Sequence, residues 1–282
     1  MKLHRLIVFL FLFFAVATVE AKPHKQKHKC PETPQNISVM VTDVTQNVVT
    51  TNHDSDKIRA LASMTKLMTA IIALDHDLNM NRKLQLSNKA GSHLPKREYT
   101  RGELFHALLI KSDNAAAETL AADYPGGREH FIRDMNIRAE MIGMYSTRFD
   151  DPSGLSSNNV STAADVTLMV ITASMYPQIR EISVKKSTTI LTQVKRKERV
   201  LVLHNTNRAI LSQVDGVHVS KTGYTNPAGF CVAMMVEKQV NNVIHYQVIV
   251  VMGAKNPAQR VDTVKKLVYT DNKGDYYESS RV

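Results

Sequence analysis

Three short strings in this chain carry side chains that could together perform acyl transfer. The first, S-x-x-K, pairs the hydroxyl of Ser63 with the amine of Lys66. The second, S-D-N, holds Ser112 and Asn114, and the third, K-T-G, begins at Lys221. A serine hydroxyl attacks a carbonyl carbon well only when a neighbouring base takes its proton, and a lysine amine can be that base without any histidine. The strings therefore offer a nucleophile, a general base, a proton relay and a positive charge.

Sequence context separates these strings from copies that arise by chance. A second S-x-x-K begins at Ser183, and further S-x-N strings begin at Ser156 and Ser157, whereas K-T-G occurs once. Ser183 stands in a polar stretch, but Ser63 is followed by apolar residues at helical spacing, namely Leu67, Ile71, Leu74 and Leu78. Context therefore favours Ser63 as the nucleophile and Ser112 as the serine of the second string.

Helical spacing should bring the proposed nucleophile and base together. Residues three apart lie on one face of a helix, so Ser63 and Lys66 can meet. A lysine amine acts as a base only when it is neutral, which requires its pKa to fall about two to three units from about 10.4. Burial at the start of an apolar helix and a second cation nearby, for which Lys221 is the candidate, both lower the pKa.

The other two strings supply groups that would hold a substrate. Ser112 would pass a proton toward the leaving amine and Asn114 would bind a substrate amide, while both also suit a helix N-cap, a role compatible with catalysis. Lys221 would attract a substrate carboxylate, and Thr222 could hydrogen-bond the same group. Gly223 would leave space where a substrate strand approaches the backbone.

The backbone N–H groups of Ser63 and Tyr224 are the expected oxyanion hole, with a contribution of about 3 kcal/mol per donor. No cofactor or metal is expected. The chain has neither a G-x-S-x-G nor an H-E-x-x-H string, and none of its 11 histidines has ligand-like spacing in a credible helix. The chemistry is therefore predicted to rest on protein side chains alone.

The first 21 residues predict a secretory signal peptide. Lys2 and Arg5 form a basic start, an uncharged and mostly apolar run follows from 6 to 18, and small residues precede Lys22. The run is short for a bilayer span, so cleavage would leave no stable membrane anchor. An uncleaved anchor is the alternative.

Charge and cysteine content narrow the class further. The formal net charge of +10 favours attraction to anionic surfaces such as cell-wall polymers. No basic and aromatic stripe accompanies that charge, so nucleic acid is not an expected partner. Export would permit a disulfide between Cys30 and Cys231, but Cys231 lies in an apolar run typical of a core strand, and the pairing stays open.

Periodicity predicts the elements that must position these groups. Strands are expected at 37–41, 47–51, 187–194, 199–204, 216–222, 228–236 and 243–252, with Asn241 and Asn242 at a hairpin turn. Helices are expected at 63–78, 102–110, 115–122, 126–142, from 162 onward, and around 261–268. This order predicts an α+β fold in which both ends of the chain build the sheet and a helical lobe is inserted. After the signal peptide, the chain is predicted to have three parts, namely a basic tail at 22–35, a catalytic domain at 36–270 and a C-terminal tail at 271–282.

With these strings in place, the chain resembles the penicillin-recognising serine DD-peptidases, which carry the same trio. Within them it is similar to the small D-alanyl-D-alanine endopeptidases of the penicillin-binding protein 7 type, in peptidase family S11. The resemblance covers about residues 36–268 and rests on 61–70, 124–127, 154–162, 205–207 and 221–223. Relatives often carry glutamate where this chain has Asp113, a position to which no chemical role is assigned.

The resemblance implies both a fold and an activity. The fold would be an antiparallel five-stranded sheet flanked by helices, with a helical lobe and the site between them. The activity would be cleavage of D-Ala–diaminopimelate crosslinks in peptidoglycan through an acyl-enzyme on Ser63, in the periplasm of a Gram-negative bacterium. β-Lactams such as penicillin would inhibit by acylating Ser63.

Three alternatives remain. A D-alanyl-D-alanine carboxypeptidase that trims pentapeptide stems would use the same residues. A class A-like β-lactamase also needs a Glu-x-x-x-Asn string in the loop after residue 145, where this chain has Asp150 and Asp151 in a different setting. A non-catalytic cell-wall-binding protein would not need all three strings intact.

Overall fold

The computed structural model describes residues 36–88, 91–194 and 197–269. The predicted signal peptide, the basic tail, Cys30 and the C-terminal tail lie outside the described residues. The main sheet has five strands in the order β2-β1-β11-β10-β9, and all neighbours are antiparallel. Their bounds are Ser38–Asp43 for β1, Val48–His53 for β2, Val217–Thr225 for β9, Gly229–Val240 for β10 and Val243–Ala254 for β11. The predicted α+β class and five-stranded antiparallel sheet are confirmed.

The hairpin between β10 and β11 forms as predicted. Asn241 and Asn242 have φ angles of 50° and 64°, so both adopt the left-handed conformation that a two-residue hairpin turn needs. The pair Val240 and Val243 closes the ladder beside the turn. Asparagine tolerates this conformation better than most residues with a side chain, which is why the dipeptide was informative.

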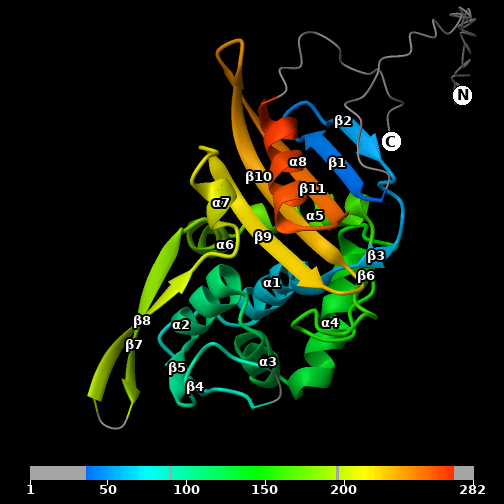
Figure 1. Cartoon of the computed structure of the whole chain (residues 1–282). Helices are drawn as coiled ribbons and strands as arrows, with labels where there is room; N and C mark the ends of the chain where they lie inside the picture. Colours follow the sequence, from blue (N-terminus) through cyan, green and yellow to red (C-terminus); the bar gives the residue numbers. More distant parts are fainter. Residues whose placement is uncertain (1–35, 89–90, 195–196, 270–282) are drawn as a thin grey trace, which may run out of the picture. The chain divides into compact units, whose positions relative to one another are not determined.

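Helices cover both faces of the sheet (Figure 1). Along β11, Val248, Val250 and Met252 pack into the larger core with α5, Ala163–Ser174. The alternate residues Ile249 and Val251 pack into a second core with α8, Pro257–Tyr269. Side chains alternate across a strand, so a strand buried on both faces reads as a continuous apolar run.

The predicted middle helices are present. The structure has η1 at Ala62–Thr65, α1 at Lys66–His76, α2 at Arg101–His106, a π-helical turn η2 at Ala107–Lys111, α3 at Asn114–Ala122 and α4 at Gly127–Met141. Every residue of helix α1 from Lys66 to Leu74 is buried. The helix therefore packs against the core on all sides, unlike a surface helix that buries a single apolar stripe. The extension of this helix to Leu78 is wrong, because the backbone turns extended at Asp77 and Leu78 is exposed.

Several short elements were not predicted. They are β3 at Arg59–Ala60 paired with β6 at Val160–Ser161, β4 at Lys83–Gln85 paired with β5 at Glu98–Thr100, and helices α6 at Pro177–Ser183 and α7 at Arg208–Leu211. Strands of two or three residues are too short to show alternation. The predicted strands β7, Ser187–Val194, and β8, Lys197–His204, form a separate hairpin.

Two expectations bear on the environment of the protein. Cys231 is buried and free, and its supposed partner Cys30 is outside the described residues. In the part of the chain that the structure describes, no helix has both the length and the apolar character to cross a membrane.

Candidate active site

The hydroxyl of Ser63 and the amine of Lys66 meet across one helical turn. Lys66 Nζ lies 2.9 Å from Ser63 Oγ. Ser63 belongs to η1 and Lys66 is the first residue of α1, so the turn joins the two helices. Ala62, directly before the serine, has a φ of 47°, which is uncommon for a residue with a side chain.

Lys66 is fully buried and donates to three oxygens. Besides Ser63 Oγ, its amine contacts Asn114 Oδ1 at 2.8 Å and the backbone oxygen of Ser153 at 2.5 Å. Among the described residues, it forms no ion pair with a carboxylate. The amine therefore contacts only neutral acceptors. Of these three oxygens, only the Ser63 hydroxyl carries a proton that it could donate to the neutral amine.

Burial controls the charge of this amine. Desolvation lowers the pKa of Lys66 to about 7, while the negative charges of Asp151, Asp113 and Glu118 act in the opposite direction. A buried amine loses stability when charged, because the interior replaces its hydration poorly. Near neutral pH, Lys66 is thus divided between the protonated form and the neutral form that can take a proton.

A second hydroxyl and amine pair lies beside the first. Lys221 Nζ donates to Ser112 Oγ at 2.9 Å and to the Thr222 backbone oxygen at 2.8 Å. Burial, and then the positive charges of Lys66 and Arg260, hold the pKa of Lys221 well below its usual value. Ser112 has a φ of 62° at the junction of η2 and α3. Both serines are partly exposed and both amines are buried, so the hydroxyls lie between the amines and solvent.

Strand β9, which carries K-T-G, is an edge of the main sheet and packs against η1. A Cβ on Gly223 would lie 3.0 Å from both Leu61 O and Ser63 N. The space that this glycine leaves therefore lies against the turn that carries Ser63, and the substrate contact predicted for Gly223 stays a prediction. The same contact brings the backbone N–H of Ser63 next to the residue that precedes Tyr224.

The loop that follows α4 contacts the amine of Lys66 through the Ser153 carbonyl, a role that no sequence pattern predicts. Asp151 accepts hydrogen bonds from Ser153 N, Ser153 Oγ, Gly154 N and Ser156 N, at 2.5–2.7 Å. These bonds fold the loop so that the Ser153 carbonyl reaches Lys66. Gly154, at φ 80°, lies so close that an added Cβ would be 1.9 Å from Ala62 O. The dense D-P-S-G turn was the available signal.

Asp113, the middle residue of S-D-N, also has a structural role that was not expected. Its Oδ1 accepts from Ala116 N and caps α3, and its Oδ2 accepts from Ser92 Oγ at 2.9 Å and His93 N at 2.6 Å. It is fully buried. Because Asn114 begins the helix that Asp113 caps, this carboxylate positions the asparagine that contacts Lys66.

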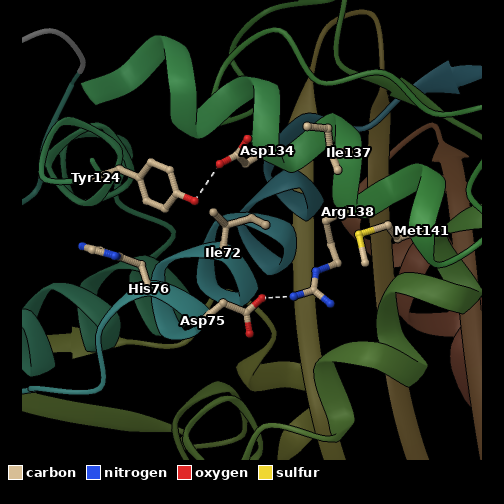
Figure 2. Close-up of a pocket in the computed structure, with 8 residues that line it drawn as sticks. All are labelled: Ile72, Asp75, His76, Tyr124, Asp134, Ile137, Arg138 and Met141. Carbon is tan, nitrogen blue, oxygen red and sulfur yellow. Dashed lines mark hydrogen bonds and ion pairs between the residues drawn. The ribbon is translucent and has the colours of Figure 1, made fainter. Parts of the chain in front are cut away.

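A second cluster of ionisable groups lies at the far end of α1. A cavity of about 360 Å³ between α1 and α4 is lined by Ile72, Asp75, His76, Tyr124, Asp134, Ile137, Arg138 and Met141 (Figure 2). Asp75 pairs with Arg138, and Asp134 accepts from the Tyr124 hydroxyl at 2.7 Å. None of the predicted site residues lines this cavity. In the described ranges, no group of three or more His, Cys, Asp or Glu side chains could hold a metal ion.

Comparison with known proteins now adds to the geometry. Residues 25–256 match the peptidase S11 family, described as D-alanyl-D-alanine carboxypeptidase. The chain is 36% identical over 205 residues to the D-alanyl-D-alanine endopeptidase of Escherichia coli, a match that spans 70% of this chain and 66% of that protein. It is 32% identical over 238 residues to the endopeptidase of the same name from Pseudomonas aeruginosa, spanning 81% and 76%.

A solved penicillin-binding protein has a similar fold. Penicillin-binding protein D2 from Listeria monocytogenes, in its ampicillin-bound form, superposes with a TM-score of 0.72 at 28% identity. The superposition covers 85% of this chain and 98% of that one.

Proposed function

The chain belongs to the peptidase S11 family of serine D-alanyl-D-alanine peptidases, and from that premise we propose that it hydrolyses D-Ala–diaminopimelate crosslinks in peptidoglycan. The observation that carries the proposal is the 2.9 Å contact between Ser63 Oγ and a buried Lys66 amine whose pKa is about 7. A hydroxyl next to a partly neutral amine is ready for nucleophilic attack at physiological pH.

Acylation begins at Ser63. Neutral Lys66 takes the hydroxyl proton as Ser63 Oγ forms a bond to the carbonyl carbon of the D-alanine residue. The carbonyl oxygen becomes an oxyanion, held by the backbone N–H groups of Ser63 and Tyr224. When the tetrahedral intermediate collapses, the C–N bond breaks and Ser112 gives a proton to the departing amine. Ser112 regains a proton from the Lys66 ammonium, so Lys66 is neutral again for the next step, and Lys221 donates to Ser112 Oγ throughout.

Deacylation reverses the roles with water in place of the amine. Lys66 takes a proton from the water, whose oxygen attacks the ester carbon, and then returns a proton to Ser63 Oγ as the ester bond breaks. No Glu-x-x-x-Asn base serves this step, and Asp151 is occupied by four hydrogen bonds within its loop. Hydrolysis of a β-lactam ester is therefore expected to be slow, which supports a penicillin-inhibited peptidase over a β-lactamase.

Substrate contacts follow from the atoms that remain available. Asn114 Oδ1 accepts from Lys66, so its Nδ2 is the atom that would donate to a substrate carbonyl. In this proposal Lys221 and Thr222 would bind a substrate carboxylate. Gly223 contributes by letting β9 approach the Ser63 turn, with the peptide chain running along the open edge of that strand.

Digestion of purified muropeptides tests the choice between endopeptidase and carboxypeptidase. Crosslinked dimers should fall to monomers, as the endopeptidases from the two Gram-negative relatives suggest by name. Pentapeptides that lose only their terminal D-alanine, with dimers left intact, would favour a carboxypeptidase. That activity is the one in the description of the S11 family.

A crosslink substrate requires export, and we propose that residues 1–21 direct the chain to the periplasm. N-terminal sequencing of protein recovered from a periplasmic extract should begin at Lys22. A sequence that begins at Met1 in the membrane fraction would instead indicate an uncleaved anchor.

A further inference from the structure

We propose that the outward face of the β7–β8 hairpin is a subsite for the leaving half of a crosslinked substrate, the peptide stem whose amine departs from the acylated serine. This inference rests on the proposed endopeptidase function and names the part of the substrate that the hairpin would bind.

One face of the hairpin is apolar and exposed. In the antiparallel register Leu191 lies opposite Val200 and Thr189 lies opposite Val202, so these side chains share a face. Leu191, Val200 and Val202 are 66%, 61% and 48% exposed. Single exposed apolar residues are ordinary, but three neighbours on one face form a contiguous strip, which is typical of a contact surface.

The other face holds the hairpin against the body of the structure. Ile190 and Leu203 are buried in the larger core, and β8 packs against η2. The hairpin extends beside α2 and the short strand β5 (Figure 1). Within the described residues, β7 and β8 pair only with each other. The apolar strip therefore lies on a hairpin whose opposite face is packed against the core.

The strip leads directly into the candidate active site. Exposed residues alternate along β8 at Val200, Val202 and His204, where the strand ends, and Thr206 is exposed in the turn that follows. Thr222 Oγ1 of K-T-G donates to Thr206 Oγ1 at 2.6 Å. The strand residues from Val200 to His204 span about 13 Å, which is enough to follow about four residues of a bound peptide.

The proposed direction of the reaction places the departing stem on this side. Ser112 would protonate the leaving amine, and the segment just before it, η2, is the one against which β8 packs. Thr206 N donates to Ile110 O in that segment at 3.1 Å. A crosslink releases an amine that still carries a whole stem, whereas pentapeptide trimming releases a single D-alanine. Only the crosslinked substrate can reach along the strip.

Charge agrees with this occupant. Arg97 donates to the backbone oxygen of Leu191 and so brings a positive side chain to the edge of the strip, whereas Arg199 alternates with Val200 and faces the other side of the hairpin. A peptide stem carries carboxylates, and a positive side chain beside an apolar strip would attract them. The aliphatic parts of the stem would contact Leu191 and Val200.

The double substitution Leu191→Glu with Val200→Glu tests the proposal in the full-length protein. We expect kcat/KM for crosslinked muropeptide dimers to fall about tenfold, mainly through KM, because two carboxylates would repel the stem. Acylation by penicillin, whose leaving group carries no stem, is the reference for an intact site. A matched control, Met141→Glu with Met175→Glu, changes two residues that are 72% and 70% exposed elsewhere and should leave both rates unchanged.

The outcomes separate the two proposals. Dimer cleavage that matches the parent in the hairpin variant, or a loss equal to that in penicillin acylation, would overturn the subsite. A parent protein that acylates with penicillin but cleaves no dimer would overturn the endopeptidase function and the subsite with it. The conservative pair Leu191→Val with Val200→Ile should keep dimer cleavage near the parent rate if apolar contact is what matters.

Discussion

Helix α1 has an ionisable cluster at each end, and the two are built differently. At the N-terminal end, Lys66 is buried among the neutral oxygens of Ser63, Asn114 and Ser153. At the C-terminal end, Asp75 pairs with Arg138 (Figure 2), and it also accepts from the Tyr176 hydroxyl at 2.6 Å. At the N-terminal end the Lys66 amine contacts only neutral oxygens among the described residues. At the C-terminal end the Asp75 carboxylate forms an ion pair with Arg138.

The pKa values follow from this difference. Lys66 falls to about 7, so its amine changes protonation near physiological pH. Tyr124 and Tyr176 rise to about 12, first through burial and then through hydrogen bonds to carboxylates, so both phenols stay protonated there. Shifted pKa values alone do not identify an active site. The direction of the shift, toward the working pH or away from it, distinguishes the reactive end from the structural end.

The largest expected effect is the loss of Ser63. Ser63→Ala should lower penicillin acylation by a factor of about 10⁴ or more, because among the described residues no other hydroxyl donates to or accepts from the Lys66 amine. The melting temperature should stay near that of the parent. Tyr176→Phe, which removes a hydroxyl at the other end of α1, should label normally. Labelling that persists in Ser63→Ala would show that the wrong hydroxyl has been assigned.

Loss of the base should separate activity from stability. Lys66→Met should lower acylation by about 10²–10⁴-fold while unfolding becomes no easier, because a buried amine is replaced by an apolar chain of similar length. Arg138→Met at the opposite end should do the reverse and cost up to about 1 kcal/mol without changing acylation. Urea unfolding together with stopped-flow acylation measures both. A sharply destabilised Lys66→Met would mean that the amine is a structural cation after all.

The pH dependence should report the state of Lys66. Below pH 7 the acylation rate should fall about tenfold per pH unit, because the protonated amine cannot take the Ser63 proton. The folded pKa lies below the unfolded value, so the unfolded chain binds more protons between about pH 7 and 10.5. Stability should therefore rise with pH across that window, by up to about 1.4 kcal/mol per unit from this group. Lys66→Met should remove this contribution, and an unchanged slope would contradict it.

The smallest effect is expected from the loop that holds Lys66. Asp151→Asn should lower acylation about tenfold to a hundredfold by displacing the Ser153 carbonyl, and it should cost about 1–3 kcal/mol of stability. The negative charge of Asp151 raises the pKa of Lys66, so its loss should move the inflection of the pH–rate profile to lower pH. Asp134→Asn at the other end of α1 is the matched control and should leave the inflection in place.

Much of this arrangement could be predicted because local patterns encode it. The Asn241-Asn242 turn and the apolar period after Ser63 each reflect a constraint that acts over a few residues. The three strings meet in space because the edge strand β9 packs against η1. This contact joins residues far apart in the chain, so only the family resemblance could predict it. The end of α1 was missed at Leu78, since an apolar residue at the right spacing continued the pattern after the backbone had turned.

The residues that were missed share a physical cause. Asp113 and Asp151 act through hydrogen bonds to backbone groups inside loops, and such bonds leave no period in the sequence. Aspartate in a loop is usually a solvated turn residue, so burial is the informative fact and it is visible only in the fold. The second cavity was invisible for the same reason, because its walls come from helices far apart in the chain.

The contact between Gly223 and the Ser63 turn has a consequence for how this protein can change over generations. A Cβ on Gly223 would meet the backbone atoms Leu61 O and Ser63 N at 3.0 Å, and backbone cannot turn aside as the end of a flexible side chain can. A side chain at Gly223 therefore requires the strand and the turn to move apart. Substitutions that alter substrate choice or antibiotic binding are therefore expected around this contact and not at Gly223 itself.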